Sequence, residues 1–461
     1  MKKQTNLIEG NISKALIKLA LPIMGTSFIQ MAYTLTDIMW LGRLSTDAVA
    51  AAGSAGFFLW FAAGLVLISK IGVGTTVAQS YGRGEISEAK KYISNGLQLD
   101  FMIGIGYALI LFLFRDSLIG FFNIDDLKVH IMATEYIKII SFGIIFHFLN
   151  PVFSAILNST GNSGTPFKIN AMGLVFNIIL DPLLIFGIGT FNGFGVKGAA
   201  IATITSQFVV TLLFVMISKK TQNIYSHTRL LRKPELVYMR RIAKLGIPAF
   251  LQTSVHSGIG MILTRIVANF GAVGIAVQSI GSQIESLTWM TAEGFSAAMG
   301  AFVGQNYGAE KYSRIKDGYK KGMQIVGSIG LFTTILFVIF PGPIFNIFVP
   351  NDPLALKEGI VYLRILGLSQ LFVSIEIGTA GAFNGLGKTM TPSVVGMVFN
   401  ALRIPMAIVL STYTILGLSG IWWSISISSI LKGLVLSLLF IKLLRESKWN
   451  GKFVLKNQAD Y

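Results

Sequence analysis

The stretch ILNSTGNSGTP at residues 156–166 recurs as AFNGLGKTMTP at residues 382–392, 226 positions further along the chain. Both copies carry an asparagine, a glycine and a proline at matching places. Further motifs recur at the same or nearly the same offset, namely LALP (19–22) as LGIP (245–248), QSYG (79–82) as QNYG (305–308), and GLVFN (173–177) as GMVFN (396–400). A repeat at a nearly constant offset indicates a duplicated structural unit. The chain is therefore predicted to contain two equivalent halves.

Composition places these halves in a membrane. Hydrophobic residues make up 53% of the 461 residues and charged residues only 13%, against about 25% charged in soluble domains. Each half holds six apolar spans, an even number, so both halves enter the membrane in the same orientation, as in transporters with parallel repeats. The sequence predicts an all-α polytopic membrane protein with twelve transmembrane helices in two pseudo-symmetric six-helix bundles. The spans lie near 14–41, 47–79, 91–114, 131–157, 166–188, 197–218, 241–267, 273–303, 317–346, 357–384, 392–414 and 417–441.

The distribution of basic residues predicts the orientation. Twelve spans put both termini on one side, and the segments on that side hold most of the 38 lysines and arginines, with dense clusters at 219–244 and 311–321. Cytoplasmic loops carry this excess, so both termini are expected in the cytosol and the chain in a cell inner (cytoplasmic) membrane. The predicted domains are an N-terminal lobe at 1–218, a cytosolic linker at 219–240, and a C-terminal lobe with a cytosolic tail at 241–461.

Two carboxylates interrupt the apolar spans of the first half. Asp37 lies within TLTDIMW (34–40), where a charged side chain costs about 2.5–3.5 kcal/mol at the centre of a membrane helix. The repeat offsets place Leu263 opposite Asp37 and Ile404 opposite Asp181, so only the first half carries the two acids, both in the outer half of the bilayer. Two carboxylates close together cannot easily both ionise. The pair is therefore a candidate site for a coupling proton or sodium ion.

Polar neighbours support a cavity beside this pair. Gln30, Tyr33 or Thr34, and Asp37 follow helical spacing on one face of the first span, because residues three or four apart face the same way. We predict that Gln30, Tyr33 and Thr34 line a substrate cavity. Pro22 in the same span is a predicted hinge, since a proline inside a helix frees a carbonyl and kinks the helix; curvature for packing is the alternative.

Other acidic residues have more open interpretations. Glu376, opposite Asn150 in the repeat, could form a second cation site in the second lobe, and structural pairing is the equal alternative. Asp126 lies in an outer loop and matches Asp352 in the repeat. Helix capping explains these two aspartates better than metal binding does.

Taken together, the motifs resemble the multidrug and toxic compound extrusion (MATE) family, within the MOP superfamily. The resemblance rests on LALP with Asp37 fifteen residues later, the paired Q-x-Y-G turns, the N-x-x-G-x-x-x-T-P segments and FNIILDP (176–182), and it covers nearly the whole chain. It implies a V-shaped pair of lobes around a central cavity that opens alternately outward and inward. It also implies antiport of a proton or sodium ion against drug-like, often cationic, organic compounds.

The two aspartates are similar to the pattern of the DinF-like branch of this family. That resemblance implies a cation site formed by Asp37 and Asp181 with Tyr136, Asn177 and Thr203. Sequences of the NorM-like branch carry an acidic residue in the seventh span, where this chain has a histidine and a serine at positions 256 and 257. This departure argues against the NorM-like branch.

Several classes of function are excluded or disfavoured. The chain has no cysteine, which rules out thiol nucleophiles and metal sites with thiolate ligands. Its four histidines have no metal-ligand spacing. No Walker A sequence is present, which argues against ATP drive. We expect an antiporter rather than an enzyme, with no cofactor or metal beyond the coupling ion, no nucleic-acid partner, and a monomer in the lipid bilayer that handles small organic substrates.

Two alternatives remain. A lipid or lipid-linked oligosaccharide flippase of the MOP superfamily would be expected to line its cavity with several arginines or lysines for phosphate, and the spans offer few. A membrane-embedded lipid-modifying enzyme would need clustered acidic or histidine ligands at the membrane face, which the sequence lacks.

Overall fold

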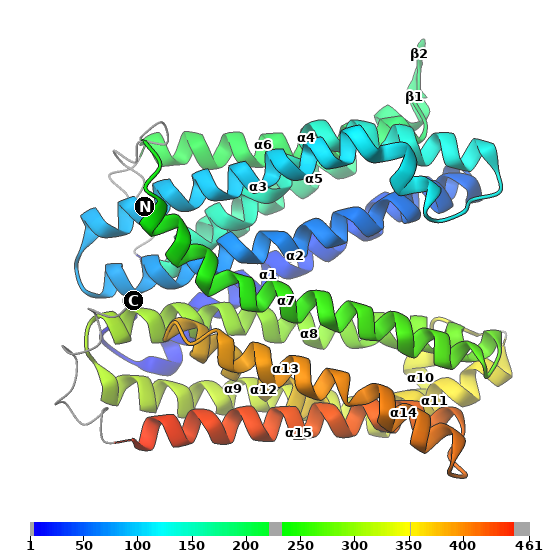
Figure 1. Cartoon of the computed structure of the whole chain (residues 1–461). Helices are drawn as coiled ribbons and strands as arrows, with labels where there is room; N and C mark the ends of the chain where they lie inside the picture. Colours follow the sequence, from blue (N-terminus) through cyan, green and yellow to red (C-terminus); the bar gives the residue numbers. More distant parts are fainter. Residues whose placement is uncertain (1–3, 221–232, 351, 447–461) are drawn as a thin grey trace. The chain divides into compact units, whose positions relative to one another are not determined.

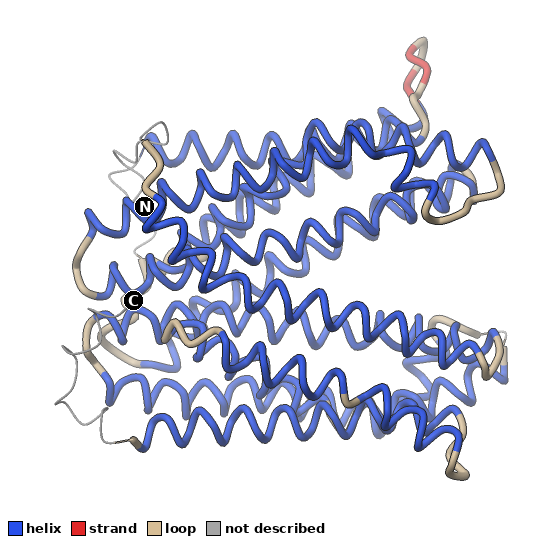
Figure 2. Tube along the Cα trace, in the orientation of Figure 1, coloured by secondary structure: helices blue, strands red, loops and turns tan. Residues whose placement is uncertain are grey.

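The computed structural model describes residues 4–220, 233–350 and 352–446, and most of these residues are helical (Figures 1 and 2). The described chain divides into two compact units. Of the described residues, unit 1 comprises residue 4 and residues 25–220 and 233–250, and unit 2 comprises residues 5–24, 251–350 and 352–446. Most of the predicted cytosolic linker and the end of the predicted tail lie outside the described residues.

The unit boundaries differ from the predicted lobe boundaries at 218 and 241. The first half of helix α1 (Ile12–Leu44) belongs to unit 2, and the first half of α7 (Leu236–Ala268) belongs to unit 1. The reason is packing: Leu16 and Leu19 are fully buried and join the core of unit 2. In the same way Ile242 of α7 is fully buried in a core of unit 1.

Unit 1 is a bundle of long helices with one short hairpin. The two-residue strands of the hairpin pair antiparallel between α5 and α6. Besides its parts of α1 and α7, the unit contains α2 (Thr46–Gly82), α3 (Ile86–Gly120), α4 (Leu127–Ser159), α5 (Gly164–Phe186), β1 (Gly187–Ile188), β2 (Phe191–Asn192) and α6 (Val196–Lys220).

Unit 2 repeats this helical plan with more breaks. Two of its spans are each divided into two consecutive helices, α11 with α12 and α13 with α14. Besides its parts of α1 and α7, the unit contains α8 (Ala272–Gly308), α9 (Tyr312–Ile339), α10 (Pro341–Asn346), α11 (Pro353–Gly367), α12 (Gln370–Gly385), α13 (Met390–Ala401), α14 (Arg403–Thr412) and α15 (Leu418–Arg445).

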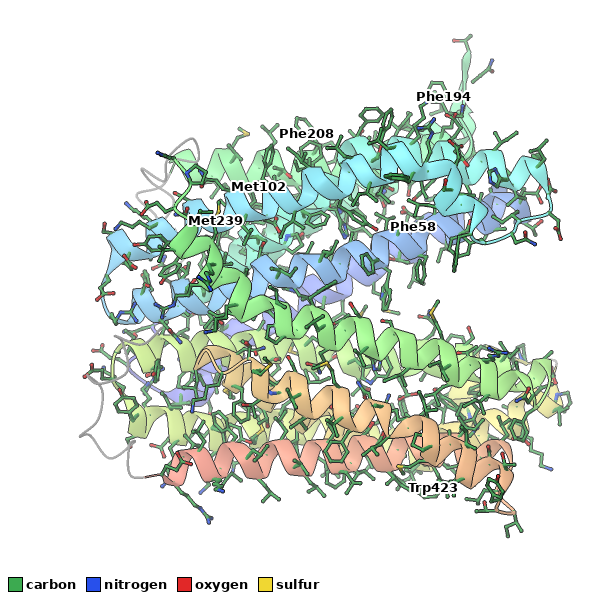
Figure 3. The ribbon with its side chains drawn as sticks, in the orientation of Figure 1. Phe58, Met102, Phe194, Phe208, Met239 and Trp423 are labelled. Atoms are coloured by element: carbon green, nitrogen blue, oxygen red, sulfur yellow. The ribbon has the colours of Figure 1, made fainter. Side chains whose placement is uncertain are left out.

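The helices have the length and surface that a membrane requires. Within the described residues, nine are long and apolar enough to span a bilayer, with α13 and α14 taken as one, and the pair α11–α12, bent by 47°, makes a tenth. Helices α7 and α8, with 33 and 37 residues, are long enough but are not among these apolar spans. Large apolar side chains are exposed, including Met102 (59%) and Phe208 (46%), both labelled in Figure 3. Together these segments account for the twelve predicted spans.

The repeated sequence motifs form the same turns in both units. Gly161 and Gly387 have φ of +87° and +76°, and their amides donate to the carbonyls of Asn158 and Asn384. Such left-handed residues end helices and favour glycine, which has no Cβ to clash. The motif that reveals the duplication is therefore a helix stop used twice.

Matched aspartates cap matched helices, as the sequence predicts. Asp126 accepts the amides of Lys128 and Val129 at the start of α4. Asp352 accepts those of Leu354 and Ala355 at the start of α11. Each cap satisfies backbone donors that the first turn of a helix leaves unpaired.

Candidate functional site

The two predicted carboxylates come together inside unit 1. Asp37 on α1 and Asp181 on α5 lie side by side, and the amide of Asn177 lies with them. The Nδ2 atom of Asn177 donates to Oδ1 of Asp181 at 3.1 Å. The Oγ1 atom of Thr203 on α6 donates to Oδ2 of Asp37 at 3.2 Å. Three helices thus build the site, and Asp181 and Asn177 are fully buried within it.

Two tyrosines flank the carboxylates. Tyr136 on α4 is 4% exposed and lies near both aspartates and Thr203. Tyr33, one turn before Asp37 on α1, is 9% exposed and also lies near both aspartates. A glycine at position 173 leaves room for the Tyr33 ring, because a Cβ there would fall 2.5 Å from its hydroxyl oxygen. All five residues predicted for the cation site are therefore gathered in one place.

The site has more buried oxygen atoms than hydrogen bonds to satisfy them. Oδ1 of Asp37, Oδ2 of Asp181, Oδ1 of Asn177 and the hydroxyl of Tyr33 have no hydrogen-bond partner among the described residues. No lysine or arginine in the described part of the chain forms an ion pair with either aspartate. Buried carboxylates without such partners are costly. Oxygen donors of this kind fit a proton or a hard cation such as sodium.

The other residues predicted on α1 are placed differently. Gln30 and Thr34 are exposed, whereas Tyr33 is turned into the bundle beside the carboxylates. The predicted substrate cavity at these positions stays a prediction. Pro22 lies inside the continuous helix α1, two residues before Met24, where the chain leaves unit 2. The predicted hinge at Pro22 thus lies close to the point where α1 passes from unit 2 to unit 1.

In unit 2 two buried acids, Glu285 and Glu376, have partners of their own. Tyr362, which matches Tyr136 in the repeat, donates to Oε1 of Glu285 at 2.7 Å. Glu376 pairs with Nζ of Lys432 at 3.1 Å, and Nζ of Lys432 also reaches Oδ1 of Asn400 at 3.4 Å. Glu376, predicted as a possible second cation site, is therefore neutralised within unit 2, which is the alternative that its sequence left open.

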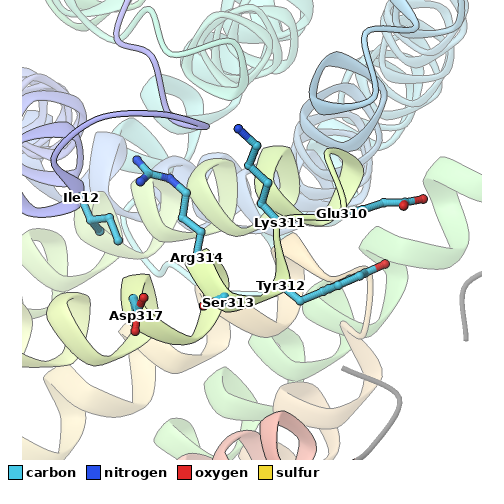
Figure 4. A pocket seen from close by; sticks show the side chains of 7 residues that line it. All are labelled: Ile12, Glu310, Lys311, Tyr312, Ser313, Arg314 and Asp317. Carbon is cyan, nitrogen blue, oxygen red and sulfur yellow. The ribbon is translucent and has the colours of Figure 1, made fainter. Parts of the chain in front are cut away.

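A pocket of about 470 Å³ lies in unit 2 beside the turn between α8 and α9 (Figure 4). Arg314 in its wall donates to the carbonyls of Leu7, Glu9 and Gly10, so its charge holds the segment before α1. The pocket contains none of the predicted site residues. Its lining is Ile12, Glu310, Lys311, Tyr312, Ser313, Arg314 and Asp317.

Sequence reasoning missed one buried acid. Asp100 on α3 is fully buried, and neither of its carboxylate oxygens has a hydrogen-bond partner among the described residues. The repeat offers the signal that could have found it, since the 226 offset places Val326 opposite Asp100. It is thus a third carboxylate that only the first half carries inside a span.

Comparison with known proteins agrees with the fold and the motifs. The sequence model of the MatE family matches residues 22–183 and 248–409, one match in each half. The chain is 29% identical over 449 residues to a protein of Thermotoga maritima named "Probable multidrug resistance protein NorM", covering 97% of this chain and 95% of that one. It is 26% identical over 450 residues to a "FAD transporter" of Shewanella oneidensis, covering 94% and 95%.

Solved structures show the same fold. A crystal structure of a MATE protein with a proline-to-alanine substitution superposes with a TM-score of 0.90 at 23% identity, covering 98% of this chain and 99% of that one. The two matches to the family model together span more than half of the chain. The predicted resemblance to the MATE family is therefore confirmed, the DinF-like branch stays a prediction, and the chain belongs to the MATE family of membrane transporters.

Proposed function

We propose that this transporter is a secondary active multidrug exporter, which exchanges a proton or sodium ion for drug-like, often cationic, organic compounds by alternating access. The observation that carries the proposal is the pair Asp37 and Asp181, because Oδ1 of Asp37 and Oδ2 of Asp181 are buried and lack hydrogen-bond partners in the described residues. A membrane protein retains such a pair at a cost, and a coupling ion offsets that cost when it binds.

The contrast with the ion pair of unit 2 supports Asp37 and Asp181 as the coupling site. Unit 2 holds its buried Glu376 against Lys432, so its carboxylate has a cation built into the fold. Asp37 and Asp181 of unit 1 lie together and have no such cation among the described residues. An exchangeable ion can bind where the fold supplies no counter-charge, and this condition is met at Asp37 and Asp181.

The proposed cycle links this site to α1. The ion binds Asp37 and Asp181 in the outward-open state, and α1 bends near Pro22. The affinity for substrate in the predicted substrate cavity of unit 1 then falls. Substrate then leaves outward. The coupling requires that ion and substrate favour different conformations, because a ligand shifts an equilibrium only by its differential affinity for the two states.

The substrate class rests on the relatives. One is named a multidrug resistance protein, which supports organic drugs as substrates. Another is named a FAD transporter, and this name favours a second candidate, export of an anionic cofactor-like solute. Both candidates place the protein in the cytoplasmic membrane with cytosolic termini, as the basic clusters predict.

The test is uptake into everted membrane vesicles that hold the full chain, in which an exporter carries substrate into the lumen, with ethidium as the cationic probe and FAD as the anionic one. Proton and sodium gradients are imposed one at a time. The proposal expects wild-type ethidium transport driven by one of the gradients, and a loss of about tenfold or more with Asp37→Asn. Asp116→Asn, an exposed change on α3, is the matched control and should behave as wild type.

Each other outcome has a definite meaning. Wild-type transport of FAD without ethidium would select the second candidate. Transport that is equal in wild type and Asp37→Asn, at equal amounts of protein, would remove the carboxylate pair from the coupling mechanism. Transport of neither probe under either gradient would contradict the exporter proposal.

A further inference from the structure

A second buried carboxylate site lies within unit 1, apart from Asp37 and Asp181. Asp100 on α3 and Ser69 on α2 are both fully buried. Ser69 faces the carboxylate, yet Oδ1 and Oδ2 of Asp100 and Oγ of Ser69 all lack a hydrogen-bond partner in the described chain. Two polar side chains from different helices thus meet in the interior without a complete set of donors.

On the turns of α3 before and after Asp100, the helix packs against apolar side chains. Residues four before and four after it on α3 are glycines that share its helical face. At Gly96 an added Cβ would meet Val73 of α2 and Ile242 of α7, and at Gly104 it would meet Phe148 of α4. The face of α3 that carries Asp100 is therefore packed tightly against α2, α4 and α7.

Among the described residues, no charged group forms an ion pair with the Asp100 carboxylate. The titratable side chains on nearby turns of the helices packed against it are Lys70 on α2, His147 on α4 and Lys244 on α7. None of them forms an ion pair or hydrogen bond with Asp100, because Asp100 has no such contact in the described residues. An ionised carboxylate in this place would lack both solvation and a partner, which is strongly unfavourable.

The chemistry of the place selects a proton over a metal ion. A hard cation needs several oxygen ligands, and the adjoining turns supply valine, isoleucine and phenylalanine. One carboxylate and one hydroxyl are too few ligands for sodium but sufficient for a proton, which forms an O–H bond to one carboxylate oxygen. A neutral carboxyl can then donate to the Ser69 hydroxyl or accept from it.

The position of Asp100 differs from that of the coupling pair. Ser69 lies 13 residues before the end of α2 at Gly82, and Asp100 lies 14 residues after the start of α3 at Ile86, so both are about 20 Å from the α2–α3 turn at 1.5 Å per residue. Asp37 lies near the opposite end of the bundle, seven residues before the end of α1 at Leu44. The two sites occupy different depths of unit 1.

We propose that Asp100 and Ser69 form a second proton-binding site of unit 1, whose protonated form is required for α3 to pack against α2, α4 and α7 as observed. Loss of the proton places a charge in this packed region and loosens it. The site also has a role in the transport cycle, which rests on the proposed function. Release of this proton favours the conformation in which water reaches the α2–α3 end of unit 1.

Infrared difference spectroscopy of the purified full chain in nanodiscs tests the protonation directly. The wild type is expected to show the carbonyl stretch of a buried protonated carboxyl group that persists in Asp37→Asn and disappears in Asp100→Asn. In Ser69→Ala the band should remain but shift in frequency, because its hydroxyl neighbour is gone. A wild-type spectrum without such a band, or a band unchanged in Asp100→Asn and Ser69→Ala, would overturn the site.

Thermal unfolding against pH tests the link to packing. The wild-type melting temperature is expected to fall as pH rises from about 5 to about 8, since unfolding exposes a group that then loses its proton. Asp100→Asn keeps the shape of the neutral acid and should weaken that fall, whereas Asp116→Asn on the same helix should leave it unchanged. A fall as steep in Asp100→Asn as in the wild type would contradict the proposal.

These two experiments do not depend on transport, so they separate this inference from the proposed function. Absence of wild-type efflux with the infrared band present would reject the exporter and leave the proton site intact. Ion-coupled wild-type efflux whose pH dependence is identical in Asp100→Asn would leave the exporter intact and reject a role for Asp100 in the cycle.

Discussion

Single residues of the first half carry charge that the second half lacks or compensates. Asp37, Asp181 and Asp100 are opposite Leu263, Ile404 and Val326 in the repeat. Positions that serve the common fold are the same in both halves, such as the glycines that end helices with positive φ. Differences between matched residues therefore identify candidates for function, and agreement identifies structural positions.

One matched pair departs from this rule in backbone geometry. Gly84 has φ of +78°, and its counterpart at the 226 offset is Glu310 with φ of +59°. A side chain in the left-handed region costs about 1–2 kcal/mol relative to its usual conformation, partly offset by the entropy that glycine loses on folding. Glu310→Gly is expected to raise the free energy of unfolding of unit 2 by roughly 0.5–1 kcal/mol, measured by denaturant unfolding in detergent.

The reverse change is the control for that prediction. Nothing lies within 4 Å of a Cβ added at Gly84, so Gly84→Ala tests backbone strain without steric clash. It should lower stability by about 1 kcal/mol. A Glu310→Gly variant that is less stable than the wild type would show that the Glu310 side chain contributes more than its backbone conformation costs.

The residues of the candidate site could largely be predicted from the sequence. Asp37, Asp181 and Asn177 were identifiable from composition and helical spacing, whereas Tyr136 and Thr203 came from the family resemblance. The exposure of Gln30 and Thr34 could not be predicted, because a spacing rule assigns residues to one face of α1 without saying which of them point inward. Glu376 and Lys432 pair although they are 56 positions apart in sequence, and the periodicity of apolar residues along a helix does not reveal such contacts between helices.

At the scale of elements, α1 is the helix that connects the most features. It contains Pro22, passes from unit 2 to unit 1 after Met24, and carries Asp37 of the candidate site near its end. Gly25, the first residue of α1 that belongs to unit 1, faces Phe167 so closely that a Cβ there would lie 2.6 Å from the ring. The proline therefore lies just before a position that is fixed by tight packing.

Replacing this proline should separate folding from transport. Pro22→Ala restores the amide hydrogen that a helix interior uses, a change worth up to about 3 kcal/mol in helix propensity, so the melting temperature should hold or rise. If α1 bends at Pro22, the variant should bind substrate but transport it several-fold more slowly. Pro248→Ala, at the matched place in α7, is the control with the smaller expected effect, and equal transport in Pro22→Ala and wild type would exclude the hinge.

The helices themselves were predictable, but their grouping was not. Apolar runs and the repeat indicate where the spans lie, and the caps at Asp126 and Asp352 follow from residue type. The assignment of the first halves of α1 and α7 to the opposite units depends on which buried side chains meet, such as Leu16 with the core of unit 2. Hydropathy contains no information about that choice.

At the scale of the whole molecule, the two units treat buried charge differently. Unit 2 pairs Glu376 with Lys432, and both side chains are less than 10% exposed. Removing one partner of a buried pair leaves an uncompensated charge, which costs about 3–5 kcal/mol, whereas removing both is often nearly neutral. Lys432→Met should therefore destabilise the protein by about this amount, and Lys432→Met with Glu376→Gln should recover most of the loss.

The recovery in the double variant is the informative part of that experiment. It is measured as an interaction free energy in a double-mutant cycle, with unfolding followed by denaturant in detergent. Additive effects of the two changes would mean that the pair is not coupled. Sodium that restores stability to Glu376→Gln alone would also contradict the account, because that variant has no carboxylate to neutralise.

The most direct test of the central claim, that Asp37 and Asp181 bind the coupling ion, is a substrate-binding titration on the purified full chain. The Kd for ethidium is measured over a range of concentrations of the ion that drives efflux. Linkage requires the ion to weaken substrate binding if the two favour different states. The Kd of the wild type is expected to rise with ion concentration, and that of Asp37→Asn to respond at least about tenfold less. The same ion dependence in Asp37→Asn as in the wild type would contradict the claim.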